Sequence, residues 1–143
     1  MLVFWVNHHY FIAGLKSADR GLLWLNGLFL LCITATPFPT GLVGAYPGTT
    51  PPLVLLSLTM CATSLAMALM RYYASRIAHL SHEHLRGQAS RTAMLQSGIA
   101  PLLYAFAALL SFAWRPGALL VQALVPLIFF LRSPARHEAD GMN

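Results

Sequence analysis

Charged side chains are scarce in this sequence, and acidic ones are the scarcest. Charged residues make up 9% of the 143 positions, whereas a soluble domain carries about 25%. Because a soluble globule needs more polar surface than this, we expect an integral membrane protein. The acidic residues fall in connections or in the tail, at Asp19, Glu83, Glu138 and Asp140. With no paired carboxylates, nucleophile–base pair or phosphate loop, the chain is not expected to be an enzyme.

Cysteine is rare as well, and the pattern of possible metal ligands is weak. Cys32 and Cys61 each lie within an apolar run, where a small buried hydrophobe is a more typical role than a disulfide. The histidines at 79, 82 and 84 are close together, but no Cys or Asp joins them, and zinc needs three or four convergent ligands. We interpret His79, His82 and His84 as a hydrated helix end, and we expect neither a metal nor a cofactor.

Hydrophobic residues, 57% of the chain, are gathered into five apolar runs. The runs are residues 2–15, 22–47, 53–70, 92–114 and 118–131. At a rise of about 1.5 Å per residue, the first is too short to cross a hydrocarbon core of about 30 Å. The sequence therefore predicts an all-α, polytopic membrane helix bundle with four full spans and an N-terminal partial span. Residues 1–132 form this bundle, and residues 133–143 form a polar cytoplasmic tail.

Two of these runs have features that bear on helix packing. In residues 22–47, the Pro37-Phe38-Pro39 break is either the hinge of a gate or a kink that ends the helix near the outer face, and we favour the second. Residues 53–70 are rich in small side chains, which let helix backbones approach closely in lipid. We expect this small face, including Ala66, to be a contact between subunits.

The basic residues predict an orientation. If each run crosses once, eight of the nine Lys and Arg residues fall on one side, and Arg115 alone falls on the other. Because basic residues are retained in the cytoplasm, the C-terminus of this multi-pass protein of the cell membrane is expected there. The basic residues also lie in short connections between the apolar runs. This placement argues against a nucleic-acid partner, which is bound by a continuous basic stripe.

Polar side chains inside apolar runs are the candidate functional residues, because they are costly in lipid. Asn7, His8 and His9 adjoin in the first run, and Asn26 lies in the second. The first three could instead be hydrated near the interface, and Asn26 could serve packing as readily as function. Adjacent histidines on a helix point about 100° apart, so His8 and His9 do not suggest a metal site.

Three motifs together resemble one known family. They are Trp5-x-x-His8-His9-x-Phe11, Leu23-Trp24-Leu25-Asn26, and Pro37-Phe38-Pro39-Thr40 before Gly44-x-Tyr46. This combination resembles the prokaryotic relatives of the endosomal and lysosomal potassium channel transmembrane protein 175. Beyond Tyr46 the resemblance rests on hydropathy and the order of spans.

The resemblance implies a potassium-permeable channel in the lipid bilayer, built from six-helix subunits that assemble as a homotetramer. It also implies that Trp5, His8, His9 and Asn26 face the pore-lining first helix and bond its polar motif. With Asn7, these residues form the expected polar network.

The family's hallmark, an Arg-x-x-x-Phe-Ser-Asp motif on the first helix, does not occur in this sequence. We therefore expect an N-terminally truncated subunit that conducts little potassium alone. One alternative is a non-conducting membrane protein that assembles or regulates partners. Another is a proton-linked transporter using His8 and His9, although the absence of acidic residues from the spans counts against it.

Overall fold

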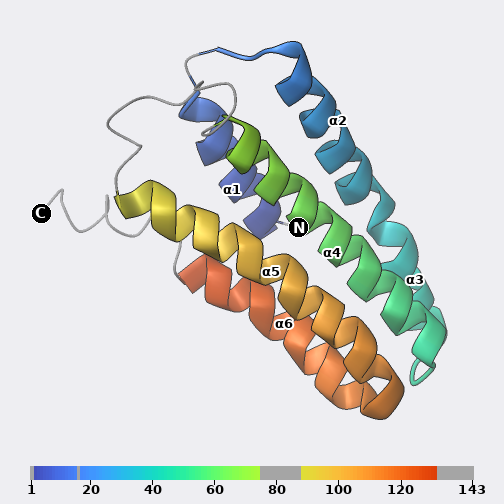
Figure 1. Cartoon of the computed structure of the whole chain (residues 1–143). Coiled ribbons are helices and arrows are strands. Elements are labelled where there is room, and N and C mark those ends of the chain that lie inside the picture. The colour runs from blue at the N-terminus through green and yellow to red at the C-terminus, as the bar shows by residue number, and fades with distance from the viewer. Residues whose placement is uncertain (1, 16, 75–87, 132–143) are drawn as a thin grey trace, which may run out of the picture.

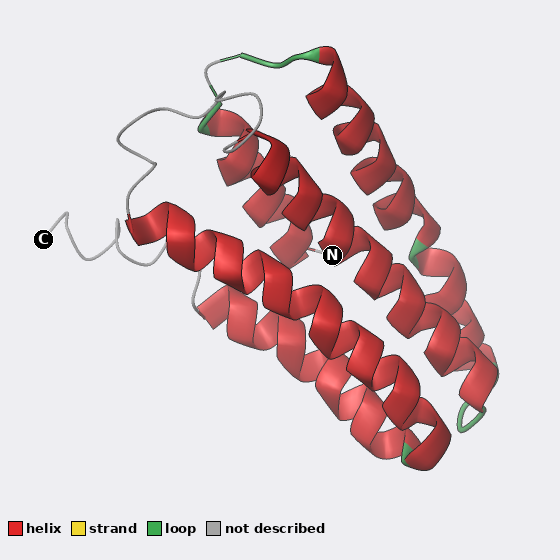
Figure 2. Ribbon diagram, in the orientation of Figure 1, coloured by secondary structure: helices red, strands yellow, loops and turns green. Residues whose placement is uncertain are grey.

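The computed structural model describes residues 2–15, 17–74 and 88–131, with side chains for residues 4–15, 17–74 and 98–128. Within these ranges the chain forms six α-helices and no β-strand (Figures 1 and 2). They are α1 (Leu2–Ala13), α2 (Arg20–Ala35), α3 (Pro37–Ala45), α4 (Thr50–Tyr72), α5 (Gln88–Ala113) and α6 (Arg115–Leu131). The prediction of an all-α helix bundle is confirmed. The three histidines, where the sequence predicted a hydrated helix end, and the polar tail lie outside the described residues.

Helix α4 is the centre of the bundle. It contacts α2 and α3 on one side and α5 and α6 on the other (Figure 1). Helix α1 lies behind α4 and covers only part of the bundle's length, because its 12 residues extend about 18 Å.

Two clusters of buried side chains hold the helices together. One joins Phe29 of α2 and Met70 of α4, with Phe4 and Phe11 of α1 packed against it. The other joins α4 to α5 and α6 around Tyr104, which is 1% exposed. Outward-facing side chains are nevertheless apolar over most of the bundle, as Trp24 (82% exposed) illustrates. A surface of this kind suits lipid rather than water.

Most of the small residues of α4 face inward, which corrects one prediction. Ala66 is 2% exposed within a single chain and packs in the cluster with Phe29, so it is not a contact between subunits. The buried Ser57, Thr63 and Ser64 donate their hydroxyls to carbonyls one turn earlier on α4. Their hydroxyl groups are hydrogen-bonded within α4, so no buried donor is left unpaired. These residues therefore allow a neighbouring helix to pack closely against α4.

The proline break ends α2 at Ala35, but the chain resumes as α3 at Pro37, so the helical segment does not stop at the break as the favoured interpretation held. Pro37 cannot donate to the carbonyl of Ile33, but the N–H of Thr36 donates to it at 3.1 Å. The hydroxyl of Thr36 in turn donates to the carbonyl of Cys32 at 3.0 Å. With both freed carbonyls satisfied, the chain resumes as α3, and α2 and α3 together give an apolar segment of 26 residues, Arg20–Ala45.

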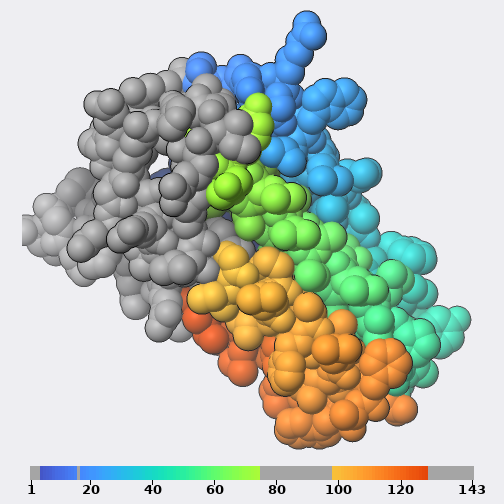
Figure 3. All heavy atoms as spheres, viewed as in Figure 1, coloured from blue at the N-terminus to red at the C-terminus, as the bar shows by residue number. Residues whose placement is uncertain are grey.

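By length and hydropathy, two helical segments of the described chain can cross a membrane: Arg20–Ala45 and Thr50–Tyr72. Gly98–Ala113 and Arg115–Ile128 are apolar but shorter. Figure 3 shows how the first two run side by side along one face, with α4 between α3 and α5. The ends of these segments define two rims of the bundle. One rim carries the α1–α2 connection and the end of α4, and the other carries the α3–α4 and α5–α6 turns.

Candidate functional site

A polar contact joins α1 to α2 in the region where the sequence predicted functional residues. Phe4 and Phe11 of α1 pack against the buried cluster, as does Leu15 just after the helix. His8 falls on the same face as the two phenylalanines, because the three positions are spaced by three or four residues. The His8 ring stacks on Phe29 with centroids 4.9 Å apart and an interplanar angle of 11°. Its Nε2 donates to Oδ1 of Asn26 at 2.6 Å. His8 and Asn26 are thus brought together, and each removes the cost of leaving the other unpaired.

Other members of the predicted network lie on the outward side of α1. Trp5 and His9 stack on each other with centroids 5.3 Å apart, and Tyr10 meets His9 edge-on. Trp5 is 60% exposed, and His9 is exposed as well. Asn7 is half-buried on the same helix. The predicted residues therefore divide into an inner pair, His8 and Asn26, and an outer stack, Trp5 and His9.

A second polar contact, which sequence reasoning missed, fastens the start of α2 to the end of α4. Asp19 caps α2, with Oδ1 accepting from the backbone N–H of Leu22 at 2.9 Å. Its Oδ2 accepts from the hydroxyl of Tyr73 at 2.6 Å. The Tyr73 hydroxyl first, and the Leu22 N–H second, lower the pKa of Asp19 below its usual value. The same bond raises the pKa of Tyr73, because the hydroxyl donates to a carboxylate.

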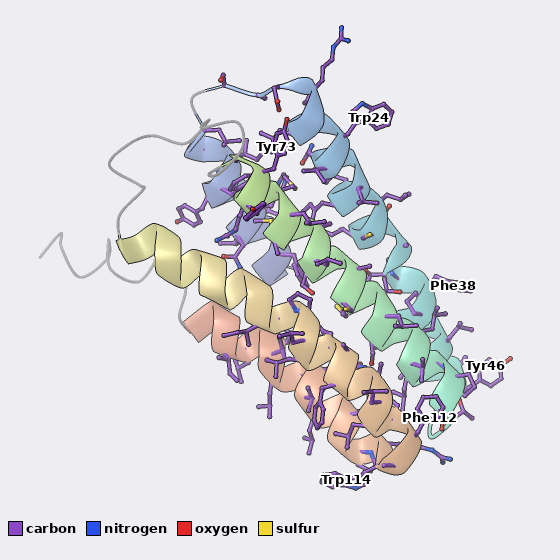
Figure 4. The ribbon with its side chains drawn as sticks, in the orientation of Figure 1. Trp24, Phe38, Tyr46, Tyr73, Phe112 and Trp114 are labelled. Atoms are coloured by element: carbon purple, nitrogen blue, oxygen red, sulfur yellow. The ribbon has the colours of Figure 1, made fainter. Side chains whose placement is uncertain are left out.

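Gly21 makes room for this contact. A Cβ at position 21 would collide with the Tyr73 hydroxyl and lie 2.6 Å from its Cζ. Figure 4 shows Tyr73 at the end of α4, beside the start of α2. The sequence offered a cap signal in Asp19, three residues before Leu22, but nothing that could identify Tyr73 as its partner.

A third polar contact lies within the bundle and was also missed. Gln122 of α6 donates through Nε2 to Ser57 Oγ and to the carbonyl of Leu53 on α4. Its Oε1 is buried without a hydrogen-bond partner. Pro126, one turn later in α6, has no N–H to offer the main-chain carbonyl of Gln122. This amide links two helices but gathers no ionisable group.

Acid–base and metal chemistry find little support in these contacts. Among the described residues, no group of three or more His, Cys, Asp or Glu side chains is placed to hold a metal ion. The contacts instead join helices: α1 to α2, α2 to α4, and α4 to α6.

Comparison with known proteins connects this arrangement to one family. The family model described as the endosomal/lysosomal potassium channel TMEM175 matches residues 1–37, the segment that contains the His8–Asn26 contact. A potassium channel of Streptomyces collinus is 28% identical over 131 residues, which are 89% of this chain and 64% of the relative. A potassium channel of Chamaesiphon minutus is 41% identical over 46 residues, or 32% of this chain and 23% of the relative.

A solved structure extends the comparison to nearly the whole chain. The crystal structure of a lysosomal potassium-selective channel TMEM175 homolog from Chamaesiphon minutus matches with a TM-score of 0.80 and 26% sequence identity. The match covers 93% of this chain and 68% of that one. The chain spans less than two thirds of the length of the two potassium channels matched by sequence.

The fold and the matched segment define the class: an α-helical membrane protein with the fold of an ion-channel subunit. More particularly, the chain is similar to the prokaryotic TMEM175 proteins, which confirms the resemblance carried by the three sequence motifs. The matched relatives are described as channels and not as enzymes, in agreement with the sequence prediction.

Proposed function

We propose that this chain is a subunit of a potassium-permeable cation channel. The observation that carries the proposal is the match to a potassium-selective channel over 93% of the chain at a TM-score of 0.80. The relative from Streptomyces collinus, matched over 89% of this chain, is also a potassium channel. Potassium ions and the lipid bilayer are the partners in this proposal.

The outer stack of α1 is the proposed contact with a pore-lining helix. Trp5 and His9 present polar ring atoms on an exposed face of a helix that contains no charge. Polar groups in lipid are costly, so such a face is favoured against another helix rather than against acyl chains. The inner pair, His8 and Asn26, supports the proposal by holding α1 against α2, with Asn7 beside it on α1.

We further propose five apolar crossings or partial crossings, a homotetramer, and a cytoplasmic C-terminus in the cell membrane. The charges support this orientation. Arg20 and Arg71 lie at the rim that carries the α1–α2 connection, and Arg115 lies at the opposite rim. The first rim would then be cytoplasmic by the retention of basic residues.

Potassium flux from liposomes tests the proposed function. Two proteins are reconstituted separately. One is the 143-residue chain, and the other is a fusion protein that adds a helix with the Arg-x-x-x-Phe-Ser-Asp motif before Met1. We expect little flux from the first and potassium-selective flux from the second, because an apolar pore dewets whereas a polar lining conducts. Replacing Trp5 or His9 by leucine should reduce the flux of the fusion, and replacing the outward-facing Trp24 by leucine is the control.

Other results would count against the proposal. Strong potassium-selective flux from the 143-residue chain alone would mean that its own spans line the pore. The role proposed for the outer stack would then be wrong. A correctly inserted fusion that passes no potassium would favour a non-conducting assembly protein. Proton uptake coupled to a solute, without potassium flux, would favour the transporter.

A further inference from the structure

An apolar groove opens between α3 and α4 at the rim formed by their turn. Its volume is about 450 Å³, within the usual range for small-ligand sites. The groove is lined by Leu42, Tyr46, Thr49, Pro51, Pro52 and Leu55, almost entirely through carbon atoms. A surface with so few hydrogen-bonding groups is suited to a hydrocarbon and not to a polar metabolite.

A cation lies at the same turn. Arg115, the first residue of α6, donates through Nη1 to the carbonyl of Gly48 at 2.7 Å and through Nε to Thr50 Oγ1 at 3.2 Å. These bonds hold the guanidinium beside Thr49, which lines the groove. They use two of its five N–H groups, so the exposed remainder can receive an anion. Of the three arginine side chains that the structure describes, only this one lies at this rim.

Aromatic side chains mark the depth of this rim in a bilayer. Tyr46 and Trp114 are 60% and 58% exposed, and Figure 4 shows both at this end of the bundle, with Phe112 nearby. Exposed Tyr and Trp rings favour the headgroup level of a membrane. The groove therefore begins at headgroup depth and runs beside α4 toward the hydrocarbon core.

We propose that this groove binds one acyl chain of an anionic phospholipid, whose phosphate is held by Arg115. The groups of the site follow the same order as those of the lipid. Arg115 lies where the phosphate would be, the ring of Tyr46 lies at the level of the headgroup, and the apolar groove accepts the acyl chain. A guanidinium matches two phosphate oxygens at once, and an anionic lipid such as phosphatidylglycerol carries no ammonium to offset the attraction. The bound lipid would tie the start of α6 to the α3–α4 turn.

Photolabelling with a lipid probe tests this site. The chain is reconstituted in phosphatidylcholine liposomes that contain a small fraction of phosphatidylglycerol with a diazirine in its acyl chain. We expect labelling to concentrate between Leu42 and Leu55. Leu55→Trp should fill the groove and abolish this labelling, whereas Leu58→Trp, at an exposed position on the same helix that does not line the groove, should leave it unchanged. Thr49→Trp gives a second filled groove if Leu55→Trp does not fold.

The headgroup contact is tested separately. Arg115→Gln should reduce labelling by the phosphatidylglycerol probe roughly fivefold or more, the loss expected for a hydrogen bond to a charged group. Labelling by the matching phosphatidylcholine probe should be weak in both proteins, and Arg20→Gln, at the other rim, is the control. Equal labelling by both probes, or no effect of Arg115→Gln, would overturn the proposal. Disulfide crosslinking of two chains through Leu55→Cys would also overturn it, because a second copy would then cover the groove.

Discussion

At the scale of single residues, the Asp19 carboxylate performs two structural tasks: it caps α2, and it accepts a hydrogen bond from Tyr73, which follows the last residue of α4. Its folded-state pKa is lowered, so its contribution to stability is present above the unfolded value, about 3.9, and is lost as the pH falls through the folded pKa. The pKa of Tyr73 is raised, so the contribution of its protonated hydroxyl is complete below about pH 10 and is lost as the pH rises through the folded pKa.

Tyr73→Phe should therefore lower the unfolding temperature in detergent near neutral pH and weaken its dependence on pH at both extremes. Gly21→Ala should have the same effect, because a Cβ there displaces the tyrosine. The two changes should not add in the double variant, since they remove one contact. Tyr46→Phe, at the opposite rim, is the control. Additive losses from Tyr73→Phe and Gly21→Ala would show that the glycine serves another purpose.

The His8–Asn26 bond should show a different pattern of coupling. His8→Phe leaves the Asn26 amide unpaired, and Asn26→Leu leaves the imidazole unpaired, so each should cost about 1–3 kcal/mol in the free energy of unfolding. The double variant should recover much of that loss, because Phe keeps the stacking on Phe29 and no polar group remains. Chemical unfolding in mixed micelles measures the cycle. Additive single effects would mean that the bond contributes no coupling.

At the scale of helices, hydropathy alone predicted the elements well. The run at residues 53–70 lies within α4, Thr50–Tyr72, and the run at 118–131 lies within α6, Arg115–Leu131. Local composition determines such boundaries, because charged residues are costly inside a lipid-crossing helix and gather near its ends. The fate of the Pro37 break was not predictable in this way, since it depends on whether Thr36 satisfies the freed carbonyls.

Contacts between helices could be predicted only for residues whose side chains must find a hydrogen-bonding partner in the membrane. A polar group in an apolar run must find a partner, so Asn7, His8, His9 and Asn26 could be selected, and two of them do meet. The partners Phe29, Tyr73 and Ser57 carry no such signal, because an aromatic ring or a serine is common in any helix. Which face of α4 turns inward was also undetermined, because the small residues permit close packing within or between subunits alike.

A substitution of Ala66 can distinguish packing within a subunit from packing between subunits. Because it is buried between α4 and α2 within one chain, Ala66→Leu should overpack the subunit and lower its free energy of unfolding by about 1–3 kcal/mol. Ala62→Leu, at an exposed position of the same helix, should change it by no more than about 0.5 kcal/mol. Light scattering of both variants should give the mass of the parent. A smaller mass for Ala66→Leu, with unchanged subunit stability, would restore the subunit-contact interpretation.

At the scale of the whole molecule, the two rims of the described chain carry different polar contacts. Figure 4 shows Tyr73 at one rim and Tyr46 at the other. Asp19 bonds Tyr73 just before Arg20 begins α2, whereas Arg115 bonds Gly48 in the α3–α4 turn. The segment Arg20–Ala45 joins the two rims and is long enough to cross once. Ser17, before α2, and Thr49, after α3, are both exposed, so a single crossing would place them on opposite sides of the membrane.

Cysteine labelling in intact cells tests this orientation. In a background with Cys32 and Cys61 replaced by alanine, Thr49→Cys should react with a membrane-impermeant maleimide added outside. Ser17→Cys should react only after the cells are permeabilised, because basic residues near a span end favour the cytoplasmic side. The reversed pattern would place Arg115 in the cytoplasm and contradict the proposed orientation. Labelling of both sites from outside would instead mean that α2 and α3 do not cross as one span, since a crossing segment separates its two ends.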